Sequence, residues 1–149
     1  MIIPDINLLI YAHDARSRFH EAAKPWWEGC LPGREAVGLP WVVLLGFLRI
    51  ICNPKVFLRP MPVGEAADHV ESWLGRPQVQ VVHPGARHGE LVLGYLRELG
   101  TAGNLTTDTH LAALGVEYQG DAAHNGCGLC QIRRPALEES AGLIRPRSA

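Results

Sequence analysis

Apolar and polar positions follow two different periods along the chain, and together they divide it into helices and short strands. Helical spacing of apolar residues predicts six helices, at 7–13, 19–31, 41–52, 63–75, 86–100 and 104–118. Three shorter apolar segments predict strands at 2–6, 35–40 and 78–83. Because strands alternate with helices, we predict an α/β domain around a small central parallel sheet.

Local signals refine two of these segments. Segment 41–52 is apolar nearly all round, so a buried helix and a strand both fit it, but its length favours the helix. Asn53-Pro54 then ends it. Pro4 indicates that the first strand is already ending, and Asn7 is available to cap the helix that follows.

Length and composition fit one globular domain. Of the 149 residues, 47% are hydrophobic and 19% are charged, so the chain needs no disulfide or structural metal to fold. The net charge is −1, from 14 basic and 15 acidic residues, which excludes a generally basic nucleic-acid-binding protein. Two readings of the cations stay open, a phosphate-contacting patch and scattered solvated charge, for Arg16, Arg18, Lys24, Arg49, Lys55 and Arg59.

We expect a cytoplasmic protein that does not enter a membrane. The apolar run 41–52 is too short to span a bilayer and contains Arg49. The N-terminal segment carries Asp5 and no basic leader, so we expect no secretory signal. The four cysteines are too sparse for a disulfide scaffold, which favours a reducing compartment.

Two acidic residues stand where a ligand site is expected. Asp5 lies where the first strand should finish, and ligands of open parallel sheets bind outside the carboxyl ends of the strands. Asp108 lies at the start of a helix, where exposed N–H groups favour an acid. Each acid alone also reads as a helix cap. Two acids brought together repel unless they are protonated or bind a metal, and oxygen-rich clusters suit Mg²⁺ or Mn²⁺.

Five stretches resemble the PIN-domain proteins and, more narrowly, the VapC-type toxins of bacterial toxin–antitoxin pairs: MIIPDINLLIYA, LPWVVLLGFLRI, NPKVF, GARHGELVLGYLRELG and GNLTTDTHLAAL. The strand–Asp–x–Asn opening and the LTTD helix start are the most diagnostic. The resemblance runs from Met1 to about Tyr118. It implies a PIN-like, three-layer α/β/α domain over residues 1–119.

The resemblance implies a metal-dependent endoribonuclease that cleaves RNA phosphodiester bonds with Mg²⁺ or Mn²⁺. It makes Asp5 and Asp108 the catalytic metal ligands and Asn7 and Thr107 supporting groups. It also implies a homodimer, and a complex with a small VapB-type antitoxin that blocks the acidic site. Two carboxylates alone suit one ion with several waters better than a two-metal site.

Gly46 is the first departure from the family pattern, because many PIN domains carry a glutamate at the matching place in the third helix. Glu90, Glu98 and Glu117 are the candidates to replace it. Glu90 and Glu98 also fit solvent-facing helix positions. Glu117 should lie more than about 10 Å from Asp108, at about 1.5 Å of helix per residue.

The second departure is the tail, residues 120–149, which has no helical or strand period and which we expect to be irregular. It lacks the D-x-D-F and G-L-x-W-x-N-P stretches that end such toxins. One permitted codon choice for 120–142, read in the next frame, encodes ATLHTTDADFARFAGLRWKNPL, which contains both. We therefore hypothesise that the tail results from a one-base shift, which resequencing of the genomic DNA tests. On this hypothesis the site lacks at least one carboxylate, and we expect reduced activity.

Two alternatives stay open. A catalytically inactive PIN-domain remnant that binds antitoxin or RNA fits the missing acids. A thiol redox or zinc protein rests only on Cys127 and Cys130, with His124 nearby, and no second cysteine pair follows them.

Overall fold

A computed structural model describes residues 1–103 and 105–120 of the chain. The elements in these residues are α1 (Ile6–His13), α2 (His20–Cys30), β1 (Val37–Pro40), α3 (Trp41–Ile51), α4 (Val63–Leu74), β2 (Val79–Val82), α5 (His88–Leu99) and α6 (Leu105–Gly120). All six predicted helices are confirmed, including the helical reading of 41–52. Gly120, which the sequence assigned to the tail, is the last residue of α6, and the domain boundary stays a prediction. The rest of the predicted irregular tail, the frame-shift hypothesis and the Cys127–Cys130 pair concern residues outside those described.

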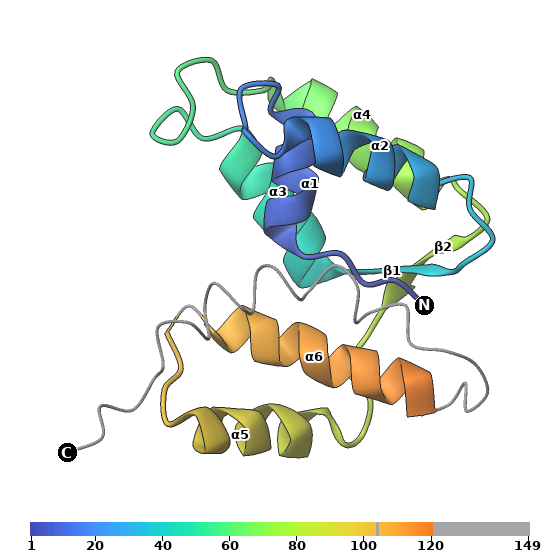
Figure 1. Ribbon diagram of the computed structural model, residues 1–149, viewed down its shortest axis with the longest axis vertical. Coiled ribbons are helices and arrows are strands. Elements are labelled where there is room, and N and C mark those ends of the chain that lie inside the picture. The colour runs from blue at the N-terminus through green and yellow to red at the C-terminus, as the bar shows by residue number, and fades with distance from the viewer. Residues whose placement is uncertain (104, 121–149) are drawn as a thin grey trace.

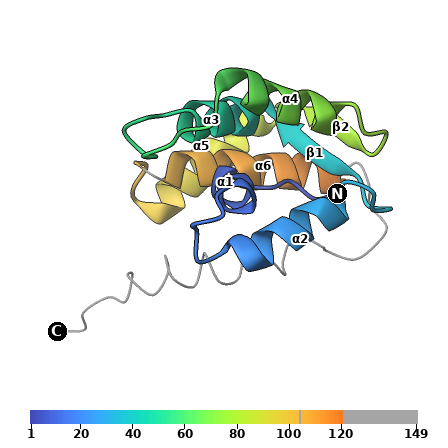
Figure 2. The same cartoon turned by 90° about the horizontal axis from the view of Figure 1, so that it is seen from above.

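The sheet of the described residues is small and parallel. β1 pairs with β2, with Val37 opposite Val79 and Pro40 opposite Val82. Figure 2 shows α3 and α4 on one side of the strands and α1 and α2 on the other. The α/β class and the central parallel sheet are therefore confirmed.

The first predicted strand is reduced to one bridge. Ile2 pairs with Val37 on the free side of β1, donating its N–H to the carbonyl of Ala36 at 2.8 Å. Pairing goes no further because Pro4 has no N–H to donate and α1 begins at Ile6. The prediction of a strand at 2–6 is therefore wrong in extent, although the segment still lies along β1.

Aromatic rings fill the centre of the half that contains α1 to α4 and the two strands. Trp27, Phe47 and Trp73 are at most 2% exposed. The Trp73 ring lies 4.9 Å from Phe47 and 5.3 Å from Trp27, between ring centroids. Rings of this size dominate the burial energy of a core, so this cluster holds α2, α3 and α4 together.

Helices α5 and α6 pack on each other at one end of the molecule (Figure 1). From α6, Leu111 and Leu114 reach the common core, whereas the buried residue of α5 is His88. Gly100 ends α5 in the left-handed conformation (φ 65°), which glycine adopts without steric cost. The chain thus returns tightly into α6, whose first turn carries Asp108.

Among residues 1–103 and 105–120, no helix combines the length and the apolar character that crossing a membrane requires. Cys30 and Cys52 are free thiols, and burial raises the pKa of Cys30.

Candidate metal centre

Asp5 caps helix α1. Its backbone is extended (φ −85°, ψ 163°), and its Oδ1 accepts hydrogen bonds from the N–H groups of Asn7 and Leu8, the second at 3.3 Å. Among the described residues, no group donates a hydrogen bond to Oδ2. The prediction that Asn7 caps the helix is wrong, because Asp5 already holds that position; the Asn7 side chain is exposed.

Asp108 lies in the first turn of α6. The helix already begins at Leu105, so Thr106 and Thr107 also lie in this turn and not ahead of it. The Thr106 hydroxyl donates to the carbonyl of Gly103 at 3.0 Å and ties the turn to the preceding loop. The carboxylate of Asp108 is partly exposed, and the helix macrodipole favours its negative charge there.

The fold brings these two helix ends into one neighbourhood. In both views the N-terminal end of α1, which Asp5 caps, lies beside the N-terminal half of α6 (Figures 1 and 2). Each acid therefore stands near the positive end of a helix. That the Asp5 and Asp108 carboxylates share one ion stays a prediction, which the experiments below test.

The donor set suits a hard divalent cation. Carboxylate oxygens are the ligands that Mg²⁺ and Mn²⁺ prefer, and Mg²⁺ typically keeps several waters beside one or two protein carboxylates. Within the described part of the chain, no three or more His, Cys, Asp or Glu side chains are grouped so that they could hold a metal ion. Asp5 and Asp108 therefore fit one ion completed by water and substrate oxygens.

A larger residue at Gly46 would have to displace the side chain of Ile6. A Cβ built there lies 2.5 Å from Cδ1 and 2.9 Å from Cγ1 of Ile6, closer than real contacts allow. Ile6 directly follows Asp5, so its side chain occupies the space that a glutamate at position 46 needs. The acid missing from the third helix is thus replaced by a close packing of α1 on α3.

Glu90, Glu98 and Glu117 are the candidates to replace the missing acid. Within the described residues, none of them forms a metal-binding group with Asp5 and Asp108. Glu90 pairs with Arg87 at 3.3 Å, and both side chains are about 70% exposed, at 69% and 70%. Glu98 is also exposed, so both solvent-facing readings are confirmed.

Glu117 begins a buried polar chain that joins α5 to α6. Its Oε2 accepts a hydrogen bond from the N–H of Gly85 at 3.1 Å and contacts His88 Nδ1 at 2.8 Å. His88 Nε2 in turn lies 2.7 Å from His110 Nδ1. The side chains of Glu117 and His88 are each 11% exposed. One sequence signal was available, because His110 and Glu117 are seven residues, or two helical turns, apart on one face of α6.

Burial and hydrogen bonding shift the pKa values of Glu117 and His110. Burial raises the pKa of Glu117, but the hydrogen bonds from Gly85 and His88 outweigh it, so the pKa lies below its usual value. Burial lowers the pKa of His110, and His88 lowers it further, against an opposing effect of Glu117. Both shifts favour an ionised Glu117 and a neutral His110.

A pocket of about 520 Å³ opens beside this chain, and we name it the α5–α6 pocket. Thr107 and His110 of α6 line it, together with Val92 and Leu93 of α5 and Val42 of α3. Thr107, expected as a supporting group, thus faces a cavity next to the turn that carries Asp108.

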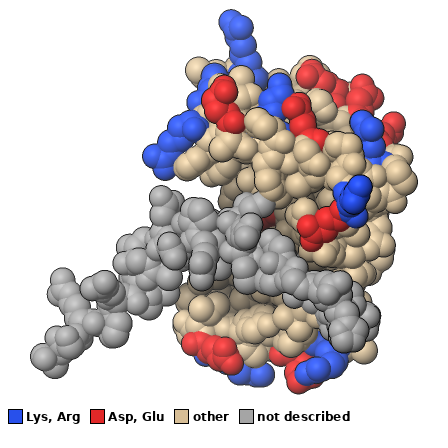
Figure 3. All heavy atoms as spheres, turned by 45° about the vertical axis from the view of Figure 1, so that its right-hand side comes forward, with Lys and Arg blue, Asp and Glu red and all other residues tan. Residues whose placement is uncertain are grey.

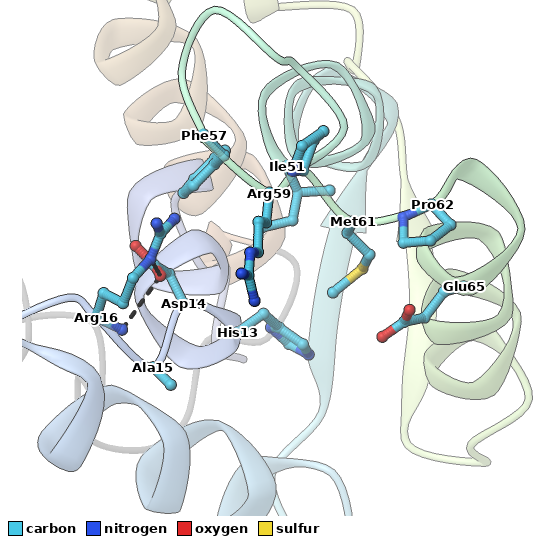
Figure 4. Close-up of a pocket in the computed structure, with 11 residues that line it drawn as sticks. His13, Asp14, Ala15, Arg16, Ile51, Phe57, Arg59, Met61, Pro62 and Glu65 are labelled. Carbon is cyan, nitrogen blue, oxygen red and sulfur yellow. Dashed lines mark hydrogen bonds and ion pairs between the residues drawn. The ribbon is translucent and has the colours of Figure 1, made fainter.

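A second pocket of about 360 Å³ lies at the other end of α1 (Figure 4). Arg16 and Arg59 line it, and Arg16 also pairs with Asp14 at 3.3 Å, beside His13. Lys24 pairs with Glu28 at 4.0 Å. Figure 3 shows cationic and acidic side chains interspersed on the face in view, which favours the reading of scattered solvated charge there.

Comparison with known proteins shows the family of the chain. The PIN domain family model matches residues 2–135. Ribonuclease VapC33 of Mycobacterium tuberculosis is 44% identical over 121 residues, which cover 81% of this chain and 85% of that protein. Ribonuclease VapC37 of the same organism is 40% identical over 119 residues, 80% of this chain and 83% of the relative. Ribonuclease VapC43 is 32% identical over 134 residues, 90% and 91% of the two chains.

Proposed function

Since the chain belongs to the PIN-domain family, and within it to the VapC ribonucleases, we propose that it is a divalent-metal-dependent endoribonuclease and the toxin of a toxin–antitoxin pair. The supporting observation is that Asp5 caps α1 and Asp108 lies in the first turn of α6, and that the N-terminal parts of these two helices lie in one neighbourhood in both views. Two carboxylates at such a place hold a hard cation more readily than they tolerate each other.

In this proposal Asp5 and Asp108 bind Mg²⁺ or Mn²⁺. Bound there, the ion supplies an acidified water and neutralises charge on the phosphodiester oxygens. The two N–H groups that hold Asp5 Oδ1 fix the carboxylate, so Oδ2 keeps a constant direction. The exposed Asn7 amide and the Thr107 hydroxyl provide hydrogen bonds to the RNA backbone near the ion.

Asp5→Asn separates the metal role of Asp5 from its cap role. Asparagine caps helices as well as aspartate does, so we expect an unchanged melting temperature. The rate of Mg²⁺-dependent cleavage of folded RNA should fall by about 100-fold or more, because a carboxylate ligand is lost. Asp108→Asn should reduce the cleavage rate to a similar extent, and EDTA should stop cleavage by the wild type.

Glu90→Gln is the matched control, because it removes an exposed acid whose partner is Arg87. It should cleave RNA at the wild-type rate. Full activity of Asp5→Asn, in a wild type that cleaves, would contradict the metal role of Asp5.

A second candidate function is an inactive remnant that binds antitoxin or RNA. Two observations favour it: the space for a third-helix acid is filled by Ile6, and the described residues supply no third ligand. Purified wild type that binds a VapB-type antitoxin but shows no metal-dependent cleavage would establish this function and reject the nuclease.

We propose as partners an RNA substrate, a cognate VapB-type antitoxin and a second copy of the chain. Co-expression with the reading frame that neighbours its gene tests the antitoxin. Light scattering of the purified chain should give twice the monomer mass if the homodimer forms.

A further inference from the structure

The chain Glu117–His88–His110 determines which nitrogen of each ring carries a proton. The ionised carboxylate of Glu117 only accepts, so His88 Nδ1 donates to it. With both rings neutral, His88 Nε2 carries a lone pair, and the 2.7 Å contact then requires His110 to donate from Nδ1. The remaining nitrogen, His110 Nε2, is left with a lone pair and accepts hydrogen bonds.

This acceptor has no partner within the described residues. His110 Nδ1 is used by His88, and no described group bonds to Nε2. The ring lines the α5–α6 pocket, whose volume of about 520 Å³ falls in the range typical of small-molecule sites. The contact between Glu117 and His88 is enough to join α5 to α6. A purely structural role therefore does not explain why His110 extends the hydrogen-bonded series.

The walls of the pocket add a second property. Val42, Val92 and Leu93 make it largely apolar. Its polar lining residues are Thr106, Thr107, His88 and His110, and the two threonines lie in the same helical turn as Asp108. An apolar slot with few fixed polar groups suits a flat ring system that carries a hydrogen-bond donor. A nucleotide has such a ring, with its donor on the base or at the 2′-hydroxyl.

We propose that the α5–α6 pocket holds one nucleotide of the RNA substrate, and that His110 Nε2 accepts a hydrogen bond from its base amino group or its 2′-hydroxyl. Glu117 and His88 are positioning residues, because they act only by fixing the His110 ring. This inference rests on the proposed nuclease function for its substrate class.

Nitrogen-15 NMR of the histidine rings at mildly alkaline pH tests the first step. His110 should show a protonated Nδ1 and a bare Nε2. Glu117→Gln should keep this pattern, because one amide oxygen can accept from both Gly85 and His88, as Oε2 does. Glu117→Met should lose it. A bare Nδ1 on His110 in the wild type, or the native pattern in Glu117→Met, overturns the proposal.

Titration with the four ribonucleoside monophosphates tests the pocket without any cleavage. At least one should shift His110 Nε2 and the methyl signals of Val92 and Leu93. For that nucleotide, the 2′-deoxy form and the form lacking the base amino group reveal which donor is used. No shift with any of the four overturns the proposal. Methyl signals that instead broaden with protein concentration and ignore nucleotides, as for a buried dimer contact, also overturn it.

Substitution of His110 gives the energetic test. His110→Leu should weaken nucleotide binding about tenfold, the value of one hydrogen bond of this kind, while His110→Gln should restore it to within about threefold by placing an amide oxygen near the Nε2 position. Tyr118→Phe is the control on the same helix, α6. It removes the hydrogen bond between Tyr118 and His83 but leaves the pocket lining intact, so nucleotide binding should not change. Equal binding by His110→Leu and the wild type overturns the proposal.

RNA cleavage separates this inference from the function on which it rests. If the wild type cleaves, His110→Leu should raise KM about tenfold and leave kcat nearly unchanged, because the contact is made equally in the ground and transition states. A fall in kcat with unchanged KM contradicts a binding role. If the wild type does not cleave, the nuclease proposal fails, while the NMR titration still decides the pocket.

Discussion

The α1–α4 half and the α5–α6 layer are stabilised by different kinds of interaction. In the α1–α4 half, buried aromatic and aliphatic side chains form one continuous core, in which the Trp73 ring contacts four further rings. In the α5–α6 layer, α5 contributes His88 as its buried residue, and Leu93 and Leu99 stay 52% and 44% exposed. Polar bonds from Glu117 and Tyr118 replace the missing apolar contacts.

The difference shows where each kind of function belongs. An apolar core stabilises the fold but offers few polar groups for chemistry. A polar chain is costly to bury, yet it orients side chains precisely along one direction. The candidate metal centre lies where the two parts meet, with Asp5 from the α1–α4 half and Asp108 from the α5–α6 layer.

Trp73→Ala should cause the largest loss of stability. It removes a side chain that is 2% exposed at the centre of the aromatic cluster, so unfolding by urea should show a loss of about 3–5 kcal/mol. Trp41→Ala, at a ring that is 49% exposed, is the control and should cost about 1 kcal/mol or less. Similar losses for both would mean that the core is not centred on Trp73.

Glu117→Met should come next, because it leaves the Gly85 N–H and Nδ1 of the buried His88 without an acceptor. We expect a loss of about 1–3 kcal/mol, measured by urea unfolding. Glu117→Gln keeps an acceptor oxygen and should lose clearly less. If the Met variant matched the wild type, polar bonds would not hold the α5–α6 layer.

Acidification should destabilise the α1–α4 half through His13. Burial lowers its folded pKa below 6.5, against the bond to Leu9, so the unfolded chain takes up the proton first. Stability should therefore fall as the pH drops below 6.5 towards the folded pKa, by at most about 1.4 kcal/mol per pH unit for one proton. His13→Phe should flatten this slope in urea unfolding between neutral and mildly acidic pH. An unchanged slope would assign the proton uptake elsewhere.

Gly46 and Ile6 should give the smallest effect, a coupling measured by a double-mutant cycle. Gly46→Ala places a methyl group against Ile6, whereas Ile6→Val removes the nearest atom, Cδ1. The double variant should therefore lose about 1 kcal/mol less free energy of unfolding than the sum of the losses of the two single variants. Strict additivity would mean that Ile6 does not close position 46.

Periodicity and chain breakers predicted the elements well because each depends on neighbouring residues. The helix at 41–52 and the strand that became β1 follow directly from local patterns. The first strand was overestimated, because its length depends on how far β1 extends and on where α1 begins.

The sites needed tertiary information. Asp5 was found from the sequence, but its role as the cap of α1 in place of Asn7 depends on the backbone angles at the start of the helix. The contact of His88 with Glu117 joins residues 29 positions apart on different helices, and no local pattern reports it. The blocked space at Gly46 likewise comes from Ile6, on another helix.

Calorimetric titration with Mn²⁺ tests most directly whether Asp5 and Asp108 grip the same ion. The wild type should bind one Mn²⁺ per chain, and Asp5→Asn and Asp108→Asn should each weaken binding by about tenfold or more, because a charged ligand is worth more than about 1.4 kcal/mol. Both variants should keep the wild-type melting temperature without metal. Wild-type Mn²⁺ affinity in either variant would contradict a shared ion.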